Sequence, residues 1–155
     1  MGVMISAGLT QAALRLLDRV AKKTGEDKTA AHLRTGRRGE EDAYFHLRRI
    51  GYVMVARNYR VARHHGEIDL IGWDKDVLCF IEVKTRTTRA VKPAEAAVDR
   101  KKRRDLKIVI RDYLRSLPEK QFPEPPQWRF DVITVYDQGV AHPTFELFQN
   151  AALSS

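Results

Sequence analysis

Two apolar segments separated by a short polar connection leave this chain few folds to choose from. Residues 67–72 and 77–85 are both rich in β-branched or aromatic side chains, which favour extended structure. The intervening residues, Trp73 to Asp76, have the length of a hairpin connection. We therefore predict two antiparallel strands, Glu67 to Gly72 and Val77 to Thr85, that pair directly with each other.

The rest of the chain alternates between helical and extended patterns. Apolar residues at three- and four-residue spacing indicate helices, and β-branched or aromatic runs indicate strands. Four prolines within residues 118–127 predict a loop there. The further predicted elements are an amphipathic helix within residues 1–35 (Leu9, Ala13, Leu16, Leu17 and Val20, with Gly25 as its stop), a helix from Arg37 to Ile50 ended by Gly51, a strand from Tyr52 to Asn58, a helix from Ala94 to Leu117 and a strand from Trp128 to Tyr136.

This order of helix, three strands, helix and strand indicates an α/β fold built around one mixed sheet. The three consecutive strands are expected to form an antiparallel meander. The helix from Ala94 to Leu117 then serves as the crossover that returns the last strand to the same sheet. At 155 residues the chain is long enough to bury one core without disulfides, so we expect a single site on a single fold.

Charge is the compositional feature that bears most on function. The chain carries a net charge of +8, and residues 84–115 alone contain twelve Lys or Arg against four Asp or Glu, a surplus of eight that equals the whole-chain value. A concentrated positive segment favours a polyanionic partner, above all nucleic acid. We therefore expect nucleic acid as a partner of the cationic first half of the Ala94 to Leu117 helix.

Cysteine content and hydropathy indicate the cellular compartment in which the protein is expected. The single cysteine, Cys79, excludes an internal disulfide and cannot by itself make a thiolate zinc site, which fits a reducing cytoplasm. The N-terminus has no basic leader, and no apolar run approaches the roughly 18 residues that a membrane span needs. We expect a cytoplasmic protein without a membrane segment.

Strand alternation gathers the polar side chains of the hairpin on one face. Within residues 77–85 the side chains of Glu82 and Lys84 point the same way, because successive residues of a strand face opposite sides. If the hairpin is centred between Asp74 and Lys75, Asp69 lies opposite Phe80 and joins the face of Glu82. The two carboxylates then lie diagonally across the strands, about 7 Å apart between Cα atoms, close enough to share one ion.

Carboxylates on an otherwise apolar strand repel each other and lose hydration, so they need a cation, a proton or a lysine nearby. Oxygen ligands favour a hard ion such as Mg²⁺. Such an ion can polarise a phosphodiester, activate a bound water and stabilise the departing oxygen, while an adjacent lysine orients the water and offsets charge. The pattern of Asp69, Glu82 and Lys84 therefore predicts a Mg²⁺ or Mn²⁺ site suited to phosphodiester hydrolysis.

Several spaced blocks of this sequence together resemble the PD-(D/E)xK nuclease superfamily, and more narrowly the YraN-like bacterial family related to archaeal Holliday-junction resolvases. The resemblance covers roughly residues 35–151, and Ile68 stands where the superfamily's name has its proline. The blocks are Gly66-Glu67-Ile68-Asp69-Leu70-Ile71, Phe80-Ile81-Glu82-Val83-Lys84, Thr35-Gly36 with Gly39-Glu40, Lys102, and Trp128-Arg129-Phe130-Asp131.

The resemblance implies a restriction-endonuclease-like core over residues 35–151, preceded by a helical extension over residues 1–34. It implies that Asp69 and Glu82 are metal ligands, that Lys84 is the catalytic lysine, and that Glu40 is a further acidic group reaching the metal through water. Lys102 would contact substrate phosphate or support the site. The cationic side chains near the site are expected to bind nucleic acid, and they are Arg86, Arg89, Arg100, Lys101 and Lys102.

Plainer explanations exist for each of these residues. The polar strand face could be a solvated cross-strand ion pair, and Glu40 could serve only the dipole of its helix. Glu67 could be a third ligand or a salt-bridge partner, and we leave it out of the metal set. His64 and His65 could form a metal pair but are more typical of a solvated turn. The basic run from Arg100 to Arg104 could be an exposed helix face.

Two functions of different classes follow from these patterns. The first is a Mg²⁺- or Mn²⁺-dependent nuclease that cuts DNA, branched or single-stranded. The second is a nucleic-acid-binding module that keeps the fold but does not cleave alone. The apolar stripe of the predicted N-terminal helix also suggests a homodimer contact.

Overall fold

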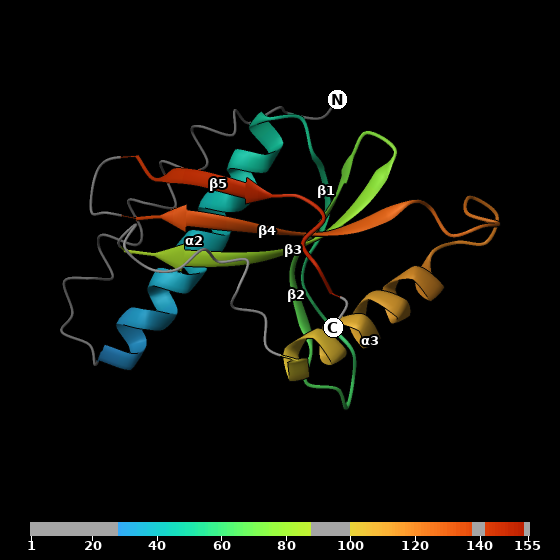
Figure 1. The fold of residues 1–155 in the computed structure, drawn as a ribbon, viewed down its shortest axis with the longest axis horizontal. Helices are drawn as coiled ribbons and strands as arrows, with labels where there is room; N and C mark the ends of the chain where they lie inside the picture. The colour runs from blue at the N-terminus through green and yellow to red at the C-terminus, as the bar shows by residue number, and fades with distance from the viewer. Residues whose placement is uncertain (1–27, 88–99, 138–141, 154–155) are drawn as a thin grey trace, which may run out of the picture.

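The structure is a computed structural model that describes residues 28–87, 100–137 and 142–153 (Figure 1). Its elements follow in the order α2 (Lys28–Arg49), β1 (Val53–Arg60), β2 (Glu67–Asp74), β3 (Val77–Arg86), α3 (Arg100–Ser116), β4 (Trp128–Tyr136) and β5 (Thr144–Phe148). The predicted N-terminal helix and the first residues of the predicted Ala94 to Leu117 helix lie outside the described residues.

The described strands form one five-stranded mixed sheet in the order β1-β2-β3-β4-β5. Strands β1, β2 and β3 form the predicted antiparallel meander, and β3 pairs parallel with β4. Because parallel strands run in the same direction, the connection from β3 to β4 must bring the chain back to the end of the sheet where β3 begins. This crossover connection contains α3. The prediction of an α/β fold with a mixed sheet is confirmed.

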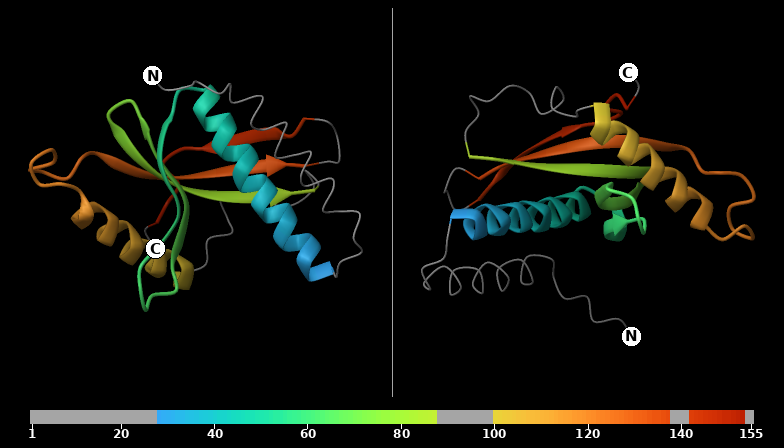
Figure 2. Two further views of the ribbon diagram at one scale, coloured as in Figure 1. Left: turned by 180° about the vertical axis from the view of Figure 1, so that it is seen from behind. Right: turned by 90° about the horizontal axis from the view of Figure 1, so that it is seen from below.

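Two helices cover opposite faces of the central strand β3, as Figure 2 shows. Leu78 and Phe80 pack in a core that includes Leu106 and Ile110 of α3. Cys79 and Ile81 pack in a second core with residues of α2. The alternation predicted for residues 77–85 is therefore confirmed. Because both faces are covered, the middle of β3 is buried, and the strand is partly exposed only at its two ends.

Two glycines let the helices approach the sheet closely. A Cβ added at Gly39 of α2 would collide with the Thr85 side chain of β3. A Cβ added at Gly66, just before β2, would lie 2.6 Å from Val109 and 2.7 Å from the backbone oxygen of Asp105 in α3. Only a residue without a side chain fits at either contact. These contacts place α2 and α3 on either side of the carboxyl end of β3.

Three details of the sequence-based prediction are wrong. The helix expected to begin near Arg37 begins at Lys28, so Thr35 and Gly36 lie inside the helix and do not precede it. The hairpin connection is the two-residue turn Lys75–Asp76, with Lys75 in the left-handed region at φ 54°. The predicted order of elements lacks the strand β5, which pairs antiparallel with β4.

The shorter turn moves the hairpin register by two residues from the predicted one. Ile71 pairs with Phe80 and Leu70 with Ile81, so Asp69 is not opposite Phe80. A shift of two residues keeps every side chain on its face, whereas a shift of one would reverse them all. Asp69 therefore still approaches Glu82 despite the wrong register.

Gly51 ends α2 as predicted. It adopts φ 104°, a left-handed conformation in which glycine pays no steric penalty. The chain then turns back so that the Tyr52 amide donates to the Leu47 carbonyl at 3.0 Å. This closed helix end delivers the chain directly into β1.

Candidate functional site

The polar residues predicted from the hairpin gather where β2 and β3 separate. Backbone pairing between these strands extends as far as Leu70 with Ile81. Beyond that point the Oδ2 atom of Asp69 accepts a hydrogen bond from the Val83 amide at 2.7 Å. The carboxylate thus takes the place of a backbone partner in the ladder. This contact fixes the Asp69 side chain beside Glu82, the neighbour of Val83 on β3.

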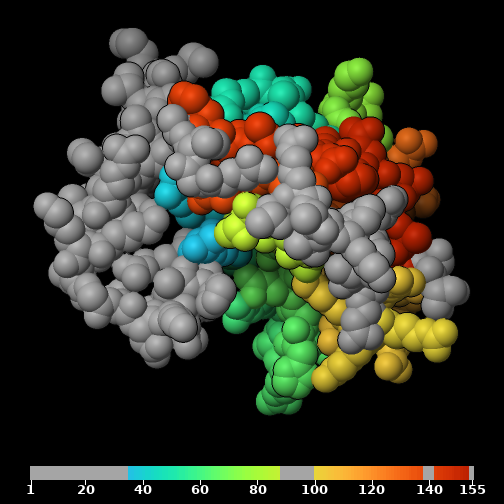
Figure 3. Space-filling model, turned by 60° about the vertical axis from the view of Figure 1, so that its left-hand side comes forward, coloured from blue at the N-terminus to red at the C-terminus, as the bar shows by residue number. Residues whose placement is uncertain are grey.

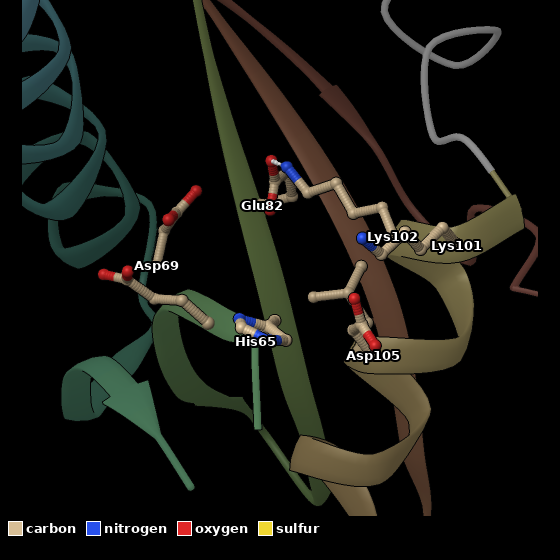
Figure 4. Close-up of a pocket in the computed structure, with 9 residues that line it drawn as sticks. His65, Asp69, Glu82, Lys101, Lys102 and Asp105 are labelled. Carbon is tan, nitrogen blue, oxygen red and sulfur yellow. Dashed lines mark hydrogen bonds and ion pairs between the residues drawn. The ribbon is translucent and has the colours of Figure 1, made fainter. Parts of the chain in front are cut away.

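Glu82 is the most buried acidic residue of the site, with 3% of its surface exposed. Its Oε1 atom accepts hydrogen bonds from Lys84, at 2.8 Å, and from Lys102 of α3 (Figure 4). Its Oε2 atom is buried and has no hydrogen-bond partner among the described residues. One oxygen of this carboxylate is therefore neutralised, while the other has no donor within the part of the chain that the structure describes.

The electrostatics of the site disfavour two ionised carboxylates. Burial, followed by the charge of Glu82, raises the pKa of Asp69 from 3.8 to about 7, although the Val83 amide opposes this rise. Burial, the largest single effect, lowers the pKa of Lys102, but its hydrogen bond to Glu82 and the charges of Glu82 and Asp69 together outweigh burial, and the net change is upward. Lys102 is therefore held as a cation, while Asp69 is poised to take up a proton near neutral pH.

Glu40 reaches the edge of the site from α2 by way of Asn58. The Asn58 amide nitrogen donates to Glu40 at 3.1 Å and to Glu67 at 3.0 Å. Asn58 itself adopts φ 49° within strand β1, a conformation that asparagine tolerates better than most residues. Glu67 also forms an ion pair with Arg60. The Glu40 carboxylate acts electrostatically on Asp69 and contributes to its raised pKa.

Two cavities open on either side of the end of β3. The one next to α3, about 460 Å³, contains the predicted ligands Asp69 and Glu82. The one next to α2, about 400 Å³, contains Glu40 and Lys84. We call them the α3-side pocket and the α2-side pocket. The first is lined by His65, Gly66, Glu67, Asp69, Glu82, Lys101, Lys102, Asp105 and Leu106, and the second by Thr35, Gly36, Glu40, Val83, Lys84, Thr85, Arg86 and Thr87.

The predicted nucleic-acid-binding residues do not all lie in one place. Lys101 and Lys102 line the α3-side pocket, and Arg86 lines the α2-side pocket. Arg100 is exposed at the first residue of α3 and lines neither pocket. Arg89 lies outside the described residues. The structure thus gathers Asp69, Glu82, Lys84 and Lys102 and leaves Arg100 at the periphery.

Some residues of the site could not be singled out from the sequence. Asn58 was predicted only as the end of a strand, yet it links two carboxylates. Its low strand propensity within a β-branched and aromatic run was the available signal. His65 was considered only as half of a metal pair, and Figure 4 shows it at the α3-side pocket, below Glu82 and between Asp69 and Asp105.

The block Trp128-Arg129-Phe130-Asp131 has a structural role. The Arg129 guanidinium donates to the buried Asp131 carboxylate, to Asp74 at 2.8 Å and to the Tyr52 hydroxyl at 2.8 Å. This network connects β4 with the hairpin and with the residue that follows α2. Neither Arg129 nor Asp131 lines either pocket. The same region holds Cys79, where burial raises the thiol pKa to about 12.

The α3-side pocket is lined by four acidic residues, the predicted ligands Asp69 and Glu82 together with Glu67 and Asp105. Among the described residues, no cluster of three or more His, Cys, Asp and Glu side chains is arranged to hold a metal. Within the same part of the chain, no helix is both long enough and apolar enough to cross a bilayer.

Fold and site together define an α/β protein whose mixed sheet carries two neighbouring acidic residues, Asp69 and Glu82, with two lysines in contact with Glu82. Comparison with known proteins places this chain in a family. Residues 39–135 match the family model described as Uncharacterised protein family UPF0102, and the chain belongs to that family, which is the YraN-like family. The matched range contains Glu40, Asp69, Glu82, Lys84 and Lys102.

Individual relatives extend the match beyond this range. A UPF0102 protein of Koribacter versatilis is 55% identical over 127 residues, covering 82% of this chain and 83% of the relative. A UPF0102 protein of Solibacter usitatus is 42% identical over 119 residues, covering 75% and 83%. One from Chlorobaculum tepidum is 42% identical over 100 residues, covering 64% and 73%.

Proposed function

We propose that this protein is a metal-dependent nuclease that hydrolyses phosphodiester bonds in DNA, with Mg²⁺ or Mn²⁺ held by Asp69 and Glu82. The observation that carries the proposal is that Asp69 accepts the Val83 amide next to the buried Glu82, whose carboxylate contacts Lys84 and Lys102. A core of the restriction-endonuclease-like type and membership of the PD-(D/E)xK superfamily belong to the same proposal. They rest on the sequence blocks that contain these residues.

The residues present fit a hard divalent ion. Glu82 Oε2 is buried and lacks a donor among the described residues, and a bound cation would satisfy it. The pKa of Asp69 is raised chiefly by burial and by Glu82, a combination that a cation between the two groups would relieve. Mg²⁺ usually retains several waters and needs only one or two protein carboxylates. Two acidic ligands are therefore sufficient for such an ion.

Each side chain would have a distinct part in hydrolysis. The ion would supply polarisation of the phosphodiester and activation of water. Lys84, 2.8 Å from Glu82, would orient the attacking water and offset negative charge. Lys102, anchored on α3, would bind a non-bridging phosphate oxygen when the substrate enters the α3-side pocket. Glu40 would hold water at the opposite edge through its oxygen atoms.

DNA as the substrate is supported by charge. The first five residues of α3, Arg100 to Arg104, are all cationic, and two of them line the α3-side pocket. A cationic helix beside a carboxylate site attracts a polyanion and neutralises its phosphates. The preferred DNA would thread its backbone between α3 and the end of β3.

Cleavage assays with a matched pair of variants test the proposal. The substrates are duplex, junction, flap and single-stranded DNA, each with Mg²⁺, Mn²⁺ or EDTA. The wild type should cleave at least one of them in a metal-dependent way, and Asp69→Asn should abolish cleavage. Asp76→Asn makes the same change at an exposed turn residue outside both pockets and should cleave normally. Equal cleavage by wild type and Asp69→Asn would reject the assignment of Asp69 as a metal ligand.

The second candidate function is a nucleic-acid-binding module without cleavage. Its support is that Lys84 and Lys102 already neutralise Glu82 without an ion. Under this alternative the same DNA panel would show binding that weakens steeply with salt, and no substrate would be cut in any metal.

A further inference from the structure

The α2-side pocket is a second cavity, which holds Lys84 and Glu40 of the proposed site but neither of the proposed metal ligands, Asp69 and Glu82. It lies on the opposite side of β3 from the α3-side pocket, between α2 and the last residues of the strand. Figure 3 shows the end of β3 reaching the molecular surface beside α2. A volume of about 400 Å³ falls within the range of ordinary small-ligand sites.

Helix α2 contains two glycines, of which one is required by the packing of the helix on β3 and the other is not. Gly39 is required by the fold, because a Cβ there would collide with Thr85. Gly36, one helical turn earlier, has no atom of a described residue within 4 Å of the position a Cβ would occupy. Glycine within a helix costs about 1 kcal/mol relative to alanine, and its φ is not positive here. Helix packing among the described residues therefore gives no reason for Gly36, whereas open space in a pocket does.

The lining of this pocket suits a phosphate group. Three threonines contribute to it, Thr35 from α2 and Thr85 and Thr87 from the end of β3 and the residue after it. Lys84 and Arg86 supply positive charge, and the Arg86 Nε atom is buried without a hydrogen-bond partner in the described part of the chain. Hydroxyls and a guanidinium are typical phosphate donors.

We propose that the α2-side pocket binds another phosphate of the nucleic-acid strand that is being hydrolysed, with Gly36 leaving room for its sugar. This inference rests on the proposed function and names how that site holds its substrate. Arg86 lies four residues beyond Glu82, about 13 Å along the strand at ~3.3 Å per residue, a span that two nucleotide units cover. The Glu40 carboxylate repels phosphate, so the phosphate lies at the Arg86 end of the pocket.

A substitution that fills the pocket tests this directly. Gly36→Leu places a side chain in the open space, and Gly36→Ala reports what helix propensity alone does. Binding of a short single-stranded oligonucleotide is measured in EDTA, so that no result depends on cleavage. We expect Gly36→Ala to raise the melting temperature and Gly36→Leu to weaken binding by about tenfold or more. Ser116→Leu, an exposed position on α3 outside both pockets, is the matched control and should bind normally.

Arg86→Gln gives a second test that does not alter the helix. It should weaken oligonucleotide binding and lower the salt dependence by about one ion, whereas Arg115→Gln, exposed and outside both pockets, should do neither. Wild-type binding by Gly36→Leu and by Arg86→Gln would overturn the inference. That result would leave the nuclease proposal intact if Asp69→Asn still abolished cleavage.

Amide chemical shifts of the wild type locate the ligand if Gly36→Leu fails to fold. Titration with the oligonucleotide should move the signals of Gly36 and Thr87 as well as that of Lys102. Movement at Lys102 alone would overturn the inference. Inorganic phosphate is the parallel titrant, and a response of Gly36 and Thr87 to phosphate but not to the oligonucleotide would identify a free-anion site and also overturn it. Movement of all three signals without any cleavage would support the pocket and count against the nuclease.

Discussion

At the scale of single residues, the central feature is a carboxylate used as a backbone partner. Asp69 accepts the Val83 amide where β2 leaves β3, and this contact brings it beside the buried Glu82. Strand alternation was sufficient to predict that the two acids share a face with Lys84, because that prediction needs only the parity of the positions. The link that Asn58 makes between Glu40 and Glu67 was not predictable, since it depends on a left-handed backbone conformation within a strand.

Asp69 makes the stability of the protein depend on pH. Its pKa is about 7 in the folded state, against an ordinary value of 3.8 for an aspartate exposed to water in the unfolded chain. Between these two pH values the folded state holds a proton that the unfolded state has released, so stability should fall as pH rises from about 4 to 7. In EDTA, Asp69→Asn should be more stable than the wild type by about 1–3 kcal/mol at pH 8 and should lose this advantage below pH 4.

Urea unfolding at several pH values measures this difference. Asp76→Asn is again the control, because its carboxylate is exposed in the hairpin turn. A pH-independent difference between wild type and Asp69→Asn would contradict the electrostatic account of this residue.

Asn58 should tolerate glycine better than alanine. Alanine at φ 49° adopts a conformation that costs about 1–2 kcal/mol, whereas glycine adopts it freely. Both variants lose the hydrogen bonds to Glu40 and Glu67. Denaturant unfolding should show Asn58→Ala to be less stable than Asn58→Gly, the reverse of the order usual in strands. An Asn58→Ala variant as stable as Asn58→Gly would show that the left-handed conformation is not maintained.

At the scale of elements, the contact between Gly39 and Thr85 sets how closely α2 packs against the end of β3. Gly39→Ala should destabilise the fold by about 1–3 kcal/mol, because the added methyl group collides with Thr85. Gly36→Ala makes the same change in open space on the same helix and should not destabilise it. The double variant Gly39→Ala with Thr85→Ala should recover part of the loss, which thermal unfolding can measure. No recovery would mean that the collision is not with the Thr85 side chain.

The elements also show which parts of the fold were predictable. The meander, the crossover and the core alternation follow from periodicity and from the handful of ways in which such elements connect. The start of α2 was not predictable, because Thr35 and Gly36 resemble a helix boundary although both lie inside the helix. A further glycine, Gly39, is present because α2 packs closely on β3. The hairpin register depended on a two-residue turn with a left-handed Lys75. The short β5 adds only five residues, and its alternation was too brief to recognise.

At the scale of the whole molecule, positive charge is unevenly distributed and should dominate binding. Affinity for an oligonucleotide in EDTA should fall steeply with salt, because each neutralised phosphate releases counterions. Lys101→Gln should lower the slope by about one ion, since Lys101 lines the α3-side pocket. Lys120→Gln, exposed beyond the end of α3, carries the same charge change and should leave the slope unchanged. Equal slopes for the two variants would mean that binding is spread over the whole surface.

The central claim is that Asp69 and Glu82 together hold one divalent ion. Titration calorimetry with Mn²⁺ compares the wild type with Asp69→Asn and with the control Asp76→Asn, in the absence of nucleic acid. We predict one saturable site in the wild type and in Asp76→Asn, and its loss in Asp69→Asn. Equal Mn²⁺ binding by all three proteins, or no binding by the wild type, would contradict the account.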